Sequence, residues 1–151
     1  MPADDADPGL AARRLMRRAG HAALATSFAG RPYVSLVAIA CDLDACLLLL
    51  LSDLAQHTQN LNVDPNVALL FAEEAASAEP LAQARLTVLG RAERCADERA
   101  AQRFAARHPA SAAYAAFADF HLYRITVERA HLVAGFGRIA WVEAKHMTAR
   151  C

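Results

Sequence analysis

Lysine is almost absent from this sequence. Lys145 is the one lysine among sixteen basic residues, and the other fifteen are arginines. A reaction that forms a Schiff base on lysine, or a P-loop that holds phosphate with lysine, therefore has almost no residue to use. Acidic residues also number sixteen, so the formal net charge is zero. Composition thus predicts neither nucleic acid nor an anionic membrane as a partner.

Long apolar runs and metal-type cysteine spacings are missing as well. The five leucines at 47–51 fall far short of the ~20 apolar residues of a membrane span, and the N-terminus has no apolar signal core. No CxxC or Cys/His zinc spacing occurs. We therefore expect a cytoplasmic protein without a protein-bound metal site, whose cysteines are reduced thiols. They are Cys41, Cys46, Cys95 and Cys151.

The length of 151 residues fits one domain, so we expect residues 1–151 to form it, with residues 1–7 disordered. Pro8 suits the first turn of a helix that Gly20 ends. Leu10, Leu15 and Ala19 should face inward on this helix. Its four arginines, at 13, 14, 17 and 18, are expected to form a solvated face rather than a binding patch.

The remaining pattern predicts a mainly β fold. Turns are expected at Ala29-Gly30 and at 42–45, a bulge at Gly90, and a break at His108-Pro109 within helical residues 98–117. The first three strands lack intervening helices, which favours an antiparallel meander closed into a small barrel over parallel βαβ layers. The six or so expected strands are 21–28, 33–40, 47–51, 67–71, 83–95 and 121–128, the last continued by 130–134.

The junction after the leucine strand could hold an anion. Ser52 and Asp53 supply oxygens that could cap a helix beginning near Leu54, with Gln56 completing a capping box, and the helix should end before Pro65. Free N–H groups and the helix dipole favour a phosphate at such an end by about 0.3–1 kcal/mol. The hydroxyls of Ser52 and Thr58 and the imidazole of His57 could contribute. An ordinary capped helix explains the same residues, and the carboxylate of Asp53 supports that alternative.

Two further motifs admit two readings each. Arg85, within a β pattern, must lie on the solvent face or meet an anion. The GFGR segment at 135–138 predicts either a structural bend or the close approach of a ligand. Phe136 and Trp141 could stack on a planar ring, although aromatic residues also belong to cores and interfaces. Hydrolysis by a Ser-His-Asp arrangement is not expected, because no aspartate stands at a recognisable spacing from Ser27 and His21.

Four segments together resemble FMN-binding split barrels related to pyridoxamine 5'-phosphate oxidase. They are ALATSFAGRPYVSLVAIA, LLLSDLAQHTQNLNVDPNVALLF, ARLTVLGRAER and DFHLYRITVERAHLVAGFGRIAW, and they extend over most of residues 13–141. The last segment is similar to the haem-utilisation branch of that superfamily. The resemblance implies a six-stranded antiparallel split β-barrel that forms homodimers, with FMN bound between the subunits.

The resemblance also assigns cofactor-binding residues. Those it implies are Ser35, Leu36, Val37, Leu51, Ser52, Gln56, His57, Thr58, Arg85 and, across a dimer interface, Arg138. Gln56, His57 and Thr58 occupy the place of the oxidases' basic phosphate-binding pair. Each charge-assisted hydrogen bond contributes about 1.5–3 kcal/mol, so this replacement should weaken phosphate binding. The segment that recognises the vitamin substrate has no counterpart, so pyridoxamine phosphate oxidation is not expected.

Three hypotheses follow. The first is an FMN-dependent oxidoreductase of unknown substrate, in which flavin chemistry requires the protein only to bind and orient its cofactor. The second is a haem-binding or haem-degrading protein that uses the same barrel without flavin, with His131 or His146 as a candidate iron ligand. The third is a non-catalytic barrel with a decayed flavin site.

Overall fold

The computed structural model describes residues 7–74, 79–135 and 137–148. The disorder expected of residues 1–6 and the stacking considered for Phe136 lie outside these ranges, whereas Asp7 caps the first helix through its side chain. The α-helices are α1 (Pro8–Arg18), α2 (Gln56–Val63) and α3 (Glu98–Arg107). The strands are β1 (His21–Phe28), β2 (Arg31–Ala38), β3 (Ala40–Cys41), β4 (Leu47–Ser52), β5 (Asn66–Ala72), β6 (Arg85–Arg94), β7 (Phe120–Val133) and β8 (Ile139–Glu143). Short 3-10 turns cover Pro80–Ala82, Pro109–Ala113 and Ala144–His146.

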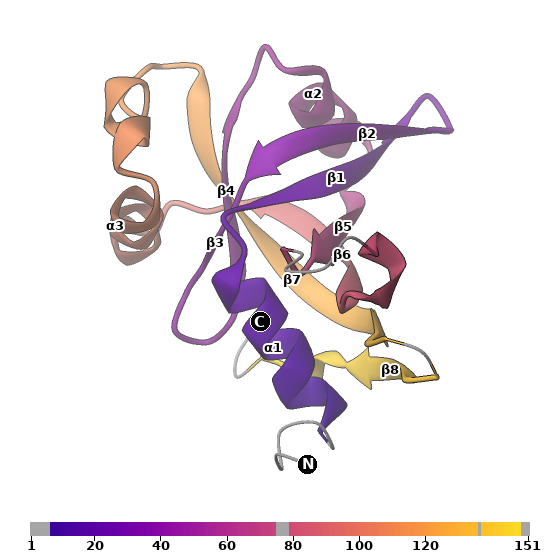
Figure 1. Ribbon diagram of the computed structural model, residues 1–151. Helices are drawn as coiled ribbons and strands as arrows, with labels where there is room; N and C mark the ends of the chain where they lie inside the picture. The colour runs from indigo at the N-terminus through magenta and orange to yellow at the C-terminus, as the bar shows by residue number, and fades with distance from the viewer. Residues whose placement is uncertain (1–6, 75–78, 136, 149–151) are drawn as a thin grey trace.

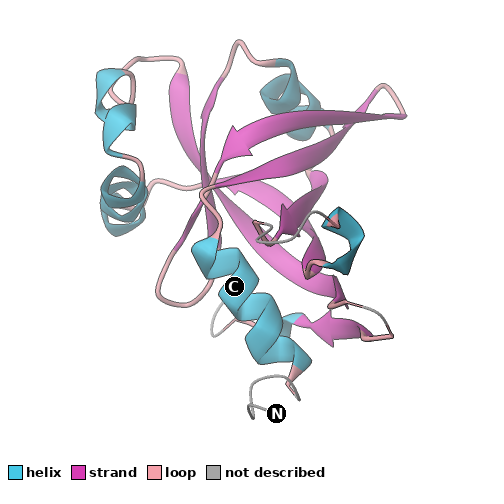
Figure 2. Ribbon diagram, in the orientation of Figure 1, coloured by secondary structure: helices cyan, strands magenta, loops and turns pink. Residues whose placement is uncertain are grey.

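One curled antiparallel sheet organises the chain (Figures 1 and 2). The strand order is β2-β1-β5-β6-β7-β4-β3. β4 pairs with the N-terminal half of β7, and β8 pairs with the C-terminal end of β7. The helices lie outside this sheet, with α1 at the lower end, α2 beside β1 and β2, and α3 beside β4 (Figure 1). The mainly β, split-barrel architecture expected from the sequence is confirmed, with eight strands in the described residues where six were expected.

The expected meander of the first three strands is confirmed only in part, because the leucine strand pairs with the end of the expected second strand, Ala40, and not with β2. β1 and β2 form the predicted hairpin, closed by Ala29 and Gly30, whose positive φ values of 52° and 80° suit a tight turn between twisted strands. The leucine strand β4 does not pair with β2 but with β3 and β7. β1 pairs instead with β5, which joins the hairpin to the rest of the sheet. β8 is an addition to the strands expected.

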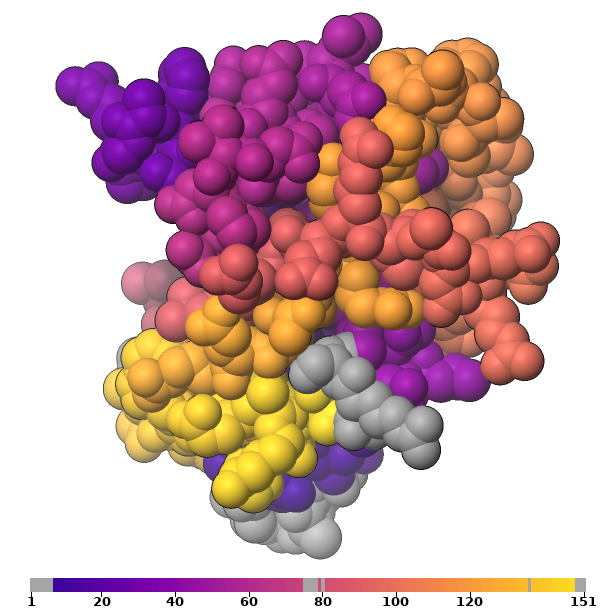
Figure 3. All heavy atoms as spheres, turned by 180° about the vertical axis from the view of Figure 1, so that it is seen from behind, coloured from indigo at the N-terminus to yellow at the C-terminus, as the bar shows by residue number. Residues whose placement is uncertain are grey.

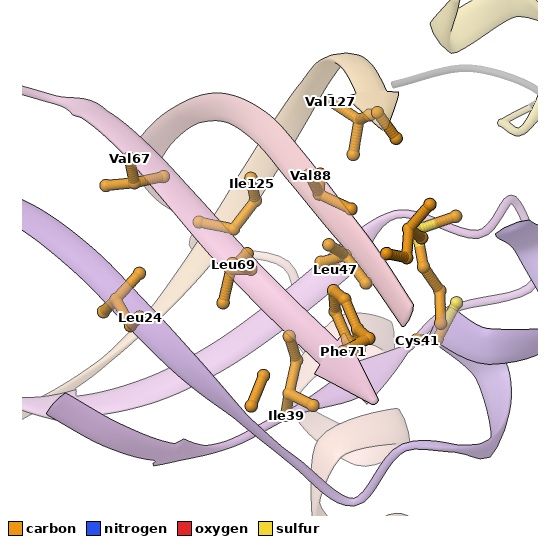
Figure 4. Packing of buried hydrophobic residues seen from close by; sticks show 14 of the residues in the cluster. Leu24, Ile39, Cys41, Leu47, Val67, Leu69, Phe71, Val88, Ile125 and Val127 are labelled. Carbon is orange, nitrogen blue, oxygen red and sulfur yellow. The ribbon is translucent and has the colours of Figure 1, made fainter. Parts of the chain in front are cut away.

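β4 is buried on both faces because two separate clusters cover it. Leu47, Leu49 and Leu51 point into the main core inside the curled sheet, which Figure 4 shows with Phe71 and Ile125. Leu48 points the other way, into a second cluster that includes Phe104 of α3. Leu50, on the same outer side, is partly buried. The prediction of a strand buried on both faces is therefore confirmed.

α1 buries a different face from the one expected. Ala12 and Met16 are its deepest side chains, while Leu15 and Ala19 pack only at the margin of the core. Gly9 lies against the backbone carbonyl of His146, where a Cβ atom would collide with it. Figure 3 shows the C-terminal segment, in yellow, lying over this indigo helix from behind. The C-terminal turn thus selects the buried face of α1.

β6 and β7 are long strands with a register shift between them. The shift falls between Leu89 and Gly90, as the sequence predicted for this glycine. A Cβ atom at Gly90 would lie 2.5 Å from the Thr126 carbonyl oxygen, so only glycine allows the two backbones this approach. The predicted break at His108-Pro109 is also confirmed, since α3 ends at Arg107.

The cysteines do not share one redox state. Cys41 and Cys95 are free thiols, but Cys46 is disulfide-bonded, so the prediction of reduced thiols is wrong at Cys46. Within the described ranges, no helix has the length and apolarity needed to cross a membrane.

Candidate cofactor site

The N-terminus of α2 lies beside the inner side of β2. The hydroxyl of Ser35, on β2, and Nδ1 of His57, in the first turn of α2, are 3.0 Å apart. Burial lowers the pKa of His57 from its ordinary value near 6.5, so the imidazole is neutral at pH 7. The site therefore presents a neutral polar pair and not a fixed positive charge.

The predicted capping box is not formed. α2 begins at Gln56 with Ala55 as its N-cap, and no side chain caps it. Ser52 is engaged elsewhere: its hydroxyl donates to Asp119 at 2.7 Å and accepts from the Leu54 amide at 3.2 Å. The first amides of α2 are thus left without a side-chain acceptor among the described residues.

Asp53 also faces away from the helix start. Its carboxylate binds Arg94 at 3.2 Å and His121 at 3.1 Å. From the sequence alone, Asp53 weighs against an anion site, because a carboxylate at the helix terminus would repel phosphate. With Arg94 and His121 as its partners, that carboxylate is balanced by positively charged or polar groups.

Thr58 adds an unsatisfied polar group. Its side chain is fully buried, and its hydroxyl oxygen has no hydrogen-bond partner within the described part of the chain. Buried hydroxyls are normally paired, since leaving one unpaired costs about 1–3 kcal/mol. Thr58 thus carries an unpaired hydroxyl that is closed off from solvent, on the first turn of an uncapped helix.

A buried hydrogen bond holds α2 in place. Asn60 donates from Nδ2 to the Thr26 hydroxyl on β1 at 3.0 Å, and both side chains are 4% exposed. Gln56 donates from Nε2 to Asn60 Oδ1 at 2.7 Å, which orients the amide of Asn60. Sequence reasoning missed Thr26 and Asn60, because nothing local distinguishes their buried contact from ordinary strand and helix polar residues.

The structure brings only some of the expected site residues together. Ser35, His57 and Thr58 meet where β2 and α2 adjoin, and Leu51 and Ser52 end the strand that leads into α2. Gln56 lies on the same helix turn. Leu36 and Val37 follow Ser35 on β2, with Leu36 facing outward at 73% exposure and Val37 buried.

Arg85 and Arg138 lie apart from this group. Arg85 begins β6 and donates to the Leu81 carbonyl oxygen at 2.7 Å. It pairs in register with Ala72, whereas the end of β5 next to α2 pairs with Arg91, six residues and roughly 20 Å along the strand. Arg138 precedes β8, beyond the same end of β7. Ser35, the partner of His57, is in register across β1 and β5 with Val88 of β6, three residues from Arg85.

Two glycines of the GFGR motif, Gly135 and Gly137, have the backbone conformation of a bend, which is one of the two interpretations of the motif. Gly135 and Gly137 have φ values of 69° and 81°, which glycine adopts without strain. On β8, Trp141 packs against His131, with ring centroids 4.6 Å apart, and the Arg129 guanidinium lies 4.0 Å from the indole centroid. Trp141 is therefore part of a surface stack on the outer face of the sheet.

The fold and this site define a split barrel of the type found around pyridoxamine 5'-phosphate oxidase. The family model described as "CREG, beta-barrel" matches residues 4–149. The chain therefore belongs to the CREG beta-barrel family. A search of curated proteins gave no match.

Solved structures agree with this assignment. One is 37% identical, covers 97% of each chain and has a TM-score of 0.87. A haem-binding protein from Mycobacterium smegmatis is 29% identical over 89% of this chain, with a TM-score of 0.83, and this chain spans 57% of it. HutZ, described as a haem storage protein of Vibrio cholerae, is 27% identical over 77% of this chain and 87% of its own, with a TM-score of 0.66. The resemblance to split barrels, including the haem-utilisation branch, is confirmed.

Proposed function

We propose that the chain binds FMN at the N-terminus of α2 and serves as a flavin-dependent oxidoreductase. The observation that carries this proposal is the uncapped helix start beside Ser35 and His57. The first amides of α2 and the imidazole of His57 are donors from which a phosphate could accept hydrogen bonds. FMN, when bound, supplies hydride or electron transfer, so the protein needs to bind, orient and shield the cofactor.

A homodimer is part of this proposal. Val34, Leu36, Leu70, Ile139 and Trp141 lie on the outer face of the sheet and are 46–73% exposed. An exposed apolar surface of this kind is typical of a protein interface. A second subunit would also allow Arg138, which precedes β8, to approach a cofactor bound between the subunits.

The dimer can be tested by sedimentation. Val34 is 64% exposed, so Val34→Glu should leave the fold intact and shift the protein toward monomer by placing carboxylates in the interface. Val63→Glu, at a valine 87% exposed on the end of α2, is the matched control and should leave the mass unchanged. A monomeric wild-type protein would contradict this part of the proposal.

The flavin site can be tested by adding charge. His57→Lys places a permanent cation beside the first turn of α2, and it should tighten FMN binding by about tenfold, the value of one charge-assisted hydrogen bond. His146→Lys is the control, because His146 is exposed and belongs to the C-terminal turn. Fluorescence titration and retention of flavin through gel filtration are the measurements. Failure to take up FMN at high micromolar concentration, or equal gains in the two variants, would refute the site.

Haem is a second candidate ligand, favoured by the haem-binding M. smegmatis protein and by HutZ. In a metal-ligating histidine, a hydrogen bond at one ring nitrogen orients the other nitrogen toward the metal, and Nδ1 of His57 shares such a bond with the Ser35 hydroxyl. Haemin titration of the wild type and of alanine variants at His57, His131 and His146 would identify the ligand. A Soret shift that survives all three substitutions would exclude these histidines.

A further inference from the structure

A hollow of about 300 Å³ lies between α1 and α3, away from the α2 site. Its lining is rich in arginine: Arg17 comes from α1, and Arg103 and Arg107 come from α3. Cys41, on β3, and Ala106 complete the wall. Figure 1 shows α1 and α3 on either side of β3. The hollow shares no residue with the site at Ser35 and His57.

Backbone carbonyl groups fix the three guanidinium groups. Arg17 donates from Nη2 to the Leu43 carbonyl oxygen at 2.7 Å. Arg103 donates from Nε to the carbonyl oxygen of Cys41 at 3.2 Å, and Arg107 donates from Nη2 to that of Arg18 at 3.3 Å. A guanidinium has five N–H donors, so each retains donors beyond the one it uses here. The arginines are thus positioned without being saturated.

Nearby acids are neutralised by another cation. Asp42 and Asp97 line the adjacent hollow, and Arg124 lies 3.9 Å and 3.3 Å from their carboxylates. In the described ranges, no carboxylate lines the arginine hollow, and none forms an ion pair with its three arginines. Arg103 also lines that adjacent hollow, so the nearest carboxylates lie beside the arginine hollow and outside its wall.

The thiol of Cys41 reports the same field. Burial raises the pKa of Cys41 to about 11; the guanidinium of Arg17 acts in the opposite direction, the carboxylate of Asp42 adds to the increase, and the guanidinium of Arg103 opposes it. Arg17 and Arg103 both line the hollow beside Cys41, and Arg103 binds the Cys41 carbonyl oxygen. Arg103 and Arg107 also stand four residues apart on α3, a spacing at which like charges repel each other and destabilise a helix.

We propose that this hollow binds a small multivalent phosphate anion, held by Arg17, Arg103 and Arg107. Arginine matches phosphate oxygens through paired N–H donors, and an anion would relieve the repulsion between the three cations. The volume suits a small molecule, and the zero net charge of the chain gives no general attraction to a nucleic acid. This site is independent of the flavin proposal.

Titration calorimetry with inorganic pyrophosphate, inorganic phosphate and sulfate tests the proposal. Pyrophosphate should bind most tightly, and Arg103→Gln and Arg107→Gln should each weaken it by about tenfold or more. Both side chains are exposed, so the fold should tolerate these changes. Arg99→Gln is the matched control, because Arg99 is exposed on the same helix, four residues before Arg103, outside the lining.

Several results would overturn the assignment. The first is the absence of any heat of binding with millimolar pyrophosphate. The second is a loss of pyrophosphate affinity in Arg99→Gln equal to the loss in Arg103→Gln and Arg107→Gln. The third is tighter binding of a single-stranded oligonucleotide than of pyrophosphate, which would indicate a polyanion surface. His57→Asp separates the two proposals. It should weaken FMN binding and leave pyrophosphate binding unchanged, whereas a loss of both would mean that pyrophosphate occupies the α2 site.

Discussion

The hydrogen bond between Thr26 and Asn60 should hold α2 in the position that the candidate site needs. Thr26→Val keeps the side-chain shape but removes the hydroxyl that accepts the hydrogen bond from Asn60 Nδ2, 3.0 Å away. The Asn60 side chain is 4% exposed, so water cannot replace that acceptor. A buried donor left unpaired costs about 1–3 kcal/mol of unfolding free energy. For a domain of this size each kcal/mol corresponds to about 2–4 °C in Tm.

Urea denaturation followed by circular dichroism measures this loss. Thr87→Val is the matched control: Thr87 is partly exposed on the outer face of β6, so its replacement should change stability by no more than about 0.5 kcal/mol. The double change Thr26→Val with Asn60→Leu should recover part of the loss, because it removes both partners. Equal stability of Thr26→Val and Thr87→Val would refute the reasoning, and so would an additive double variant.

Three further predictions concern β6, the site histidine and the thiols. Gly90→Ala should destabilise the protein by about 1–3 kcal/mol in urea, because its Cβ atom meets the Thr126 backbone, whereas Gly20→Ala meets only the flexible end of Arg107 and should be nearly neutral. Since burial lowers the pKa of His57, the unfolded chain binds the extra proton first, so stability should be full above pH ~6.5 and fall as the pH drops below it. His57→Gln should flatten that part of the pH profile, and an unchanged slope would contradict the assignment. Iodoacetamide at pH 8 should modify Cys95 faster than Cys41, whose thiol is buried with a pKa of about 11, as peptide mapping can measure.

Local structure was predictable from the sequence because its causes are local. The hairpin at Ala29-Gly30, the bulge at Gly90 and the break at His108-Pro109 each depend on the conformational preferences of one or two residues. Strand order was not predictable in this way. The partner of the leucine strand is β7, far along the chain, and no local pattern in Leu47–Leu51 indicates it.

The prediction of how α2 begins was wrong for a related reason. Ser52 and Asp53 have the right chemistry to cap a helix, but both side chains have other partners. Ser52 binds Asp119, and Asp53 binds Arg94 and His121. These partners are distant in sequence, so the competition is visible only in the folded chain. The resemblance to known split barrels supplied the neighbourhood of Ser35 and His57, which spacing alone did not indicate.

The pairing of β4 also affects how the chain can fold during synthesis. Five consecutive leucines leave the ribosome roughly 70 residues before their main partner strand does, with only the two residues of β3 to pair with in the meantime. An apolar, β-prone segment without a partner is an aggregation hazard while it waits. We expect production of the protein to depend on chaperones or slow synthesis, and chains truncated before Phe120 to be insoluble.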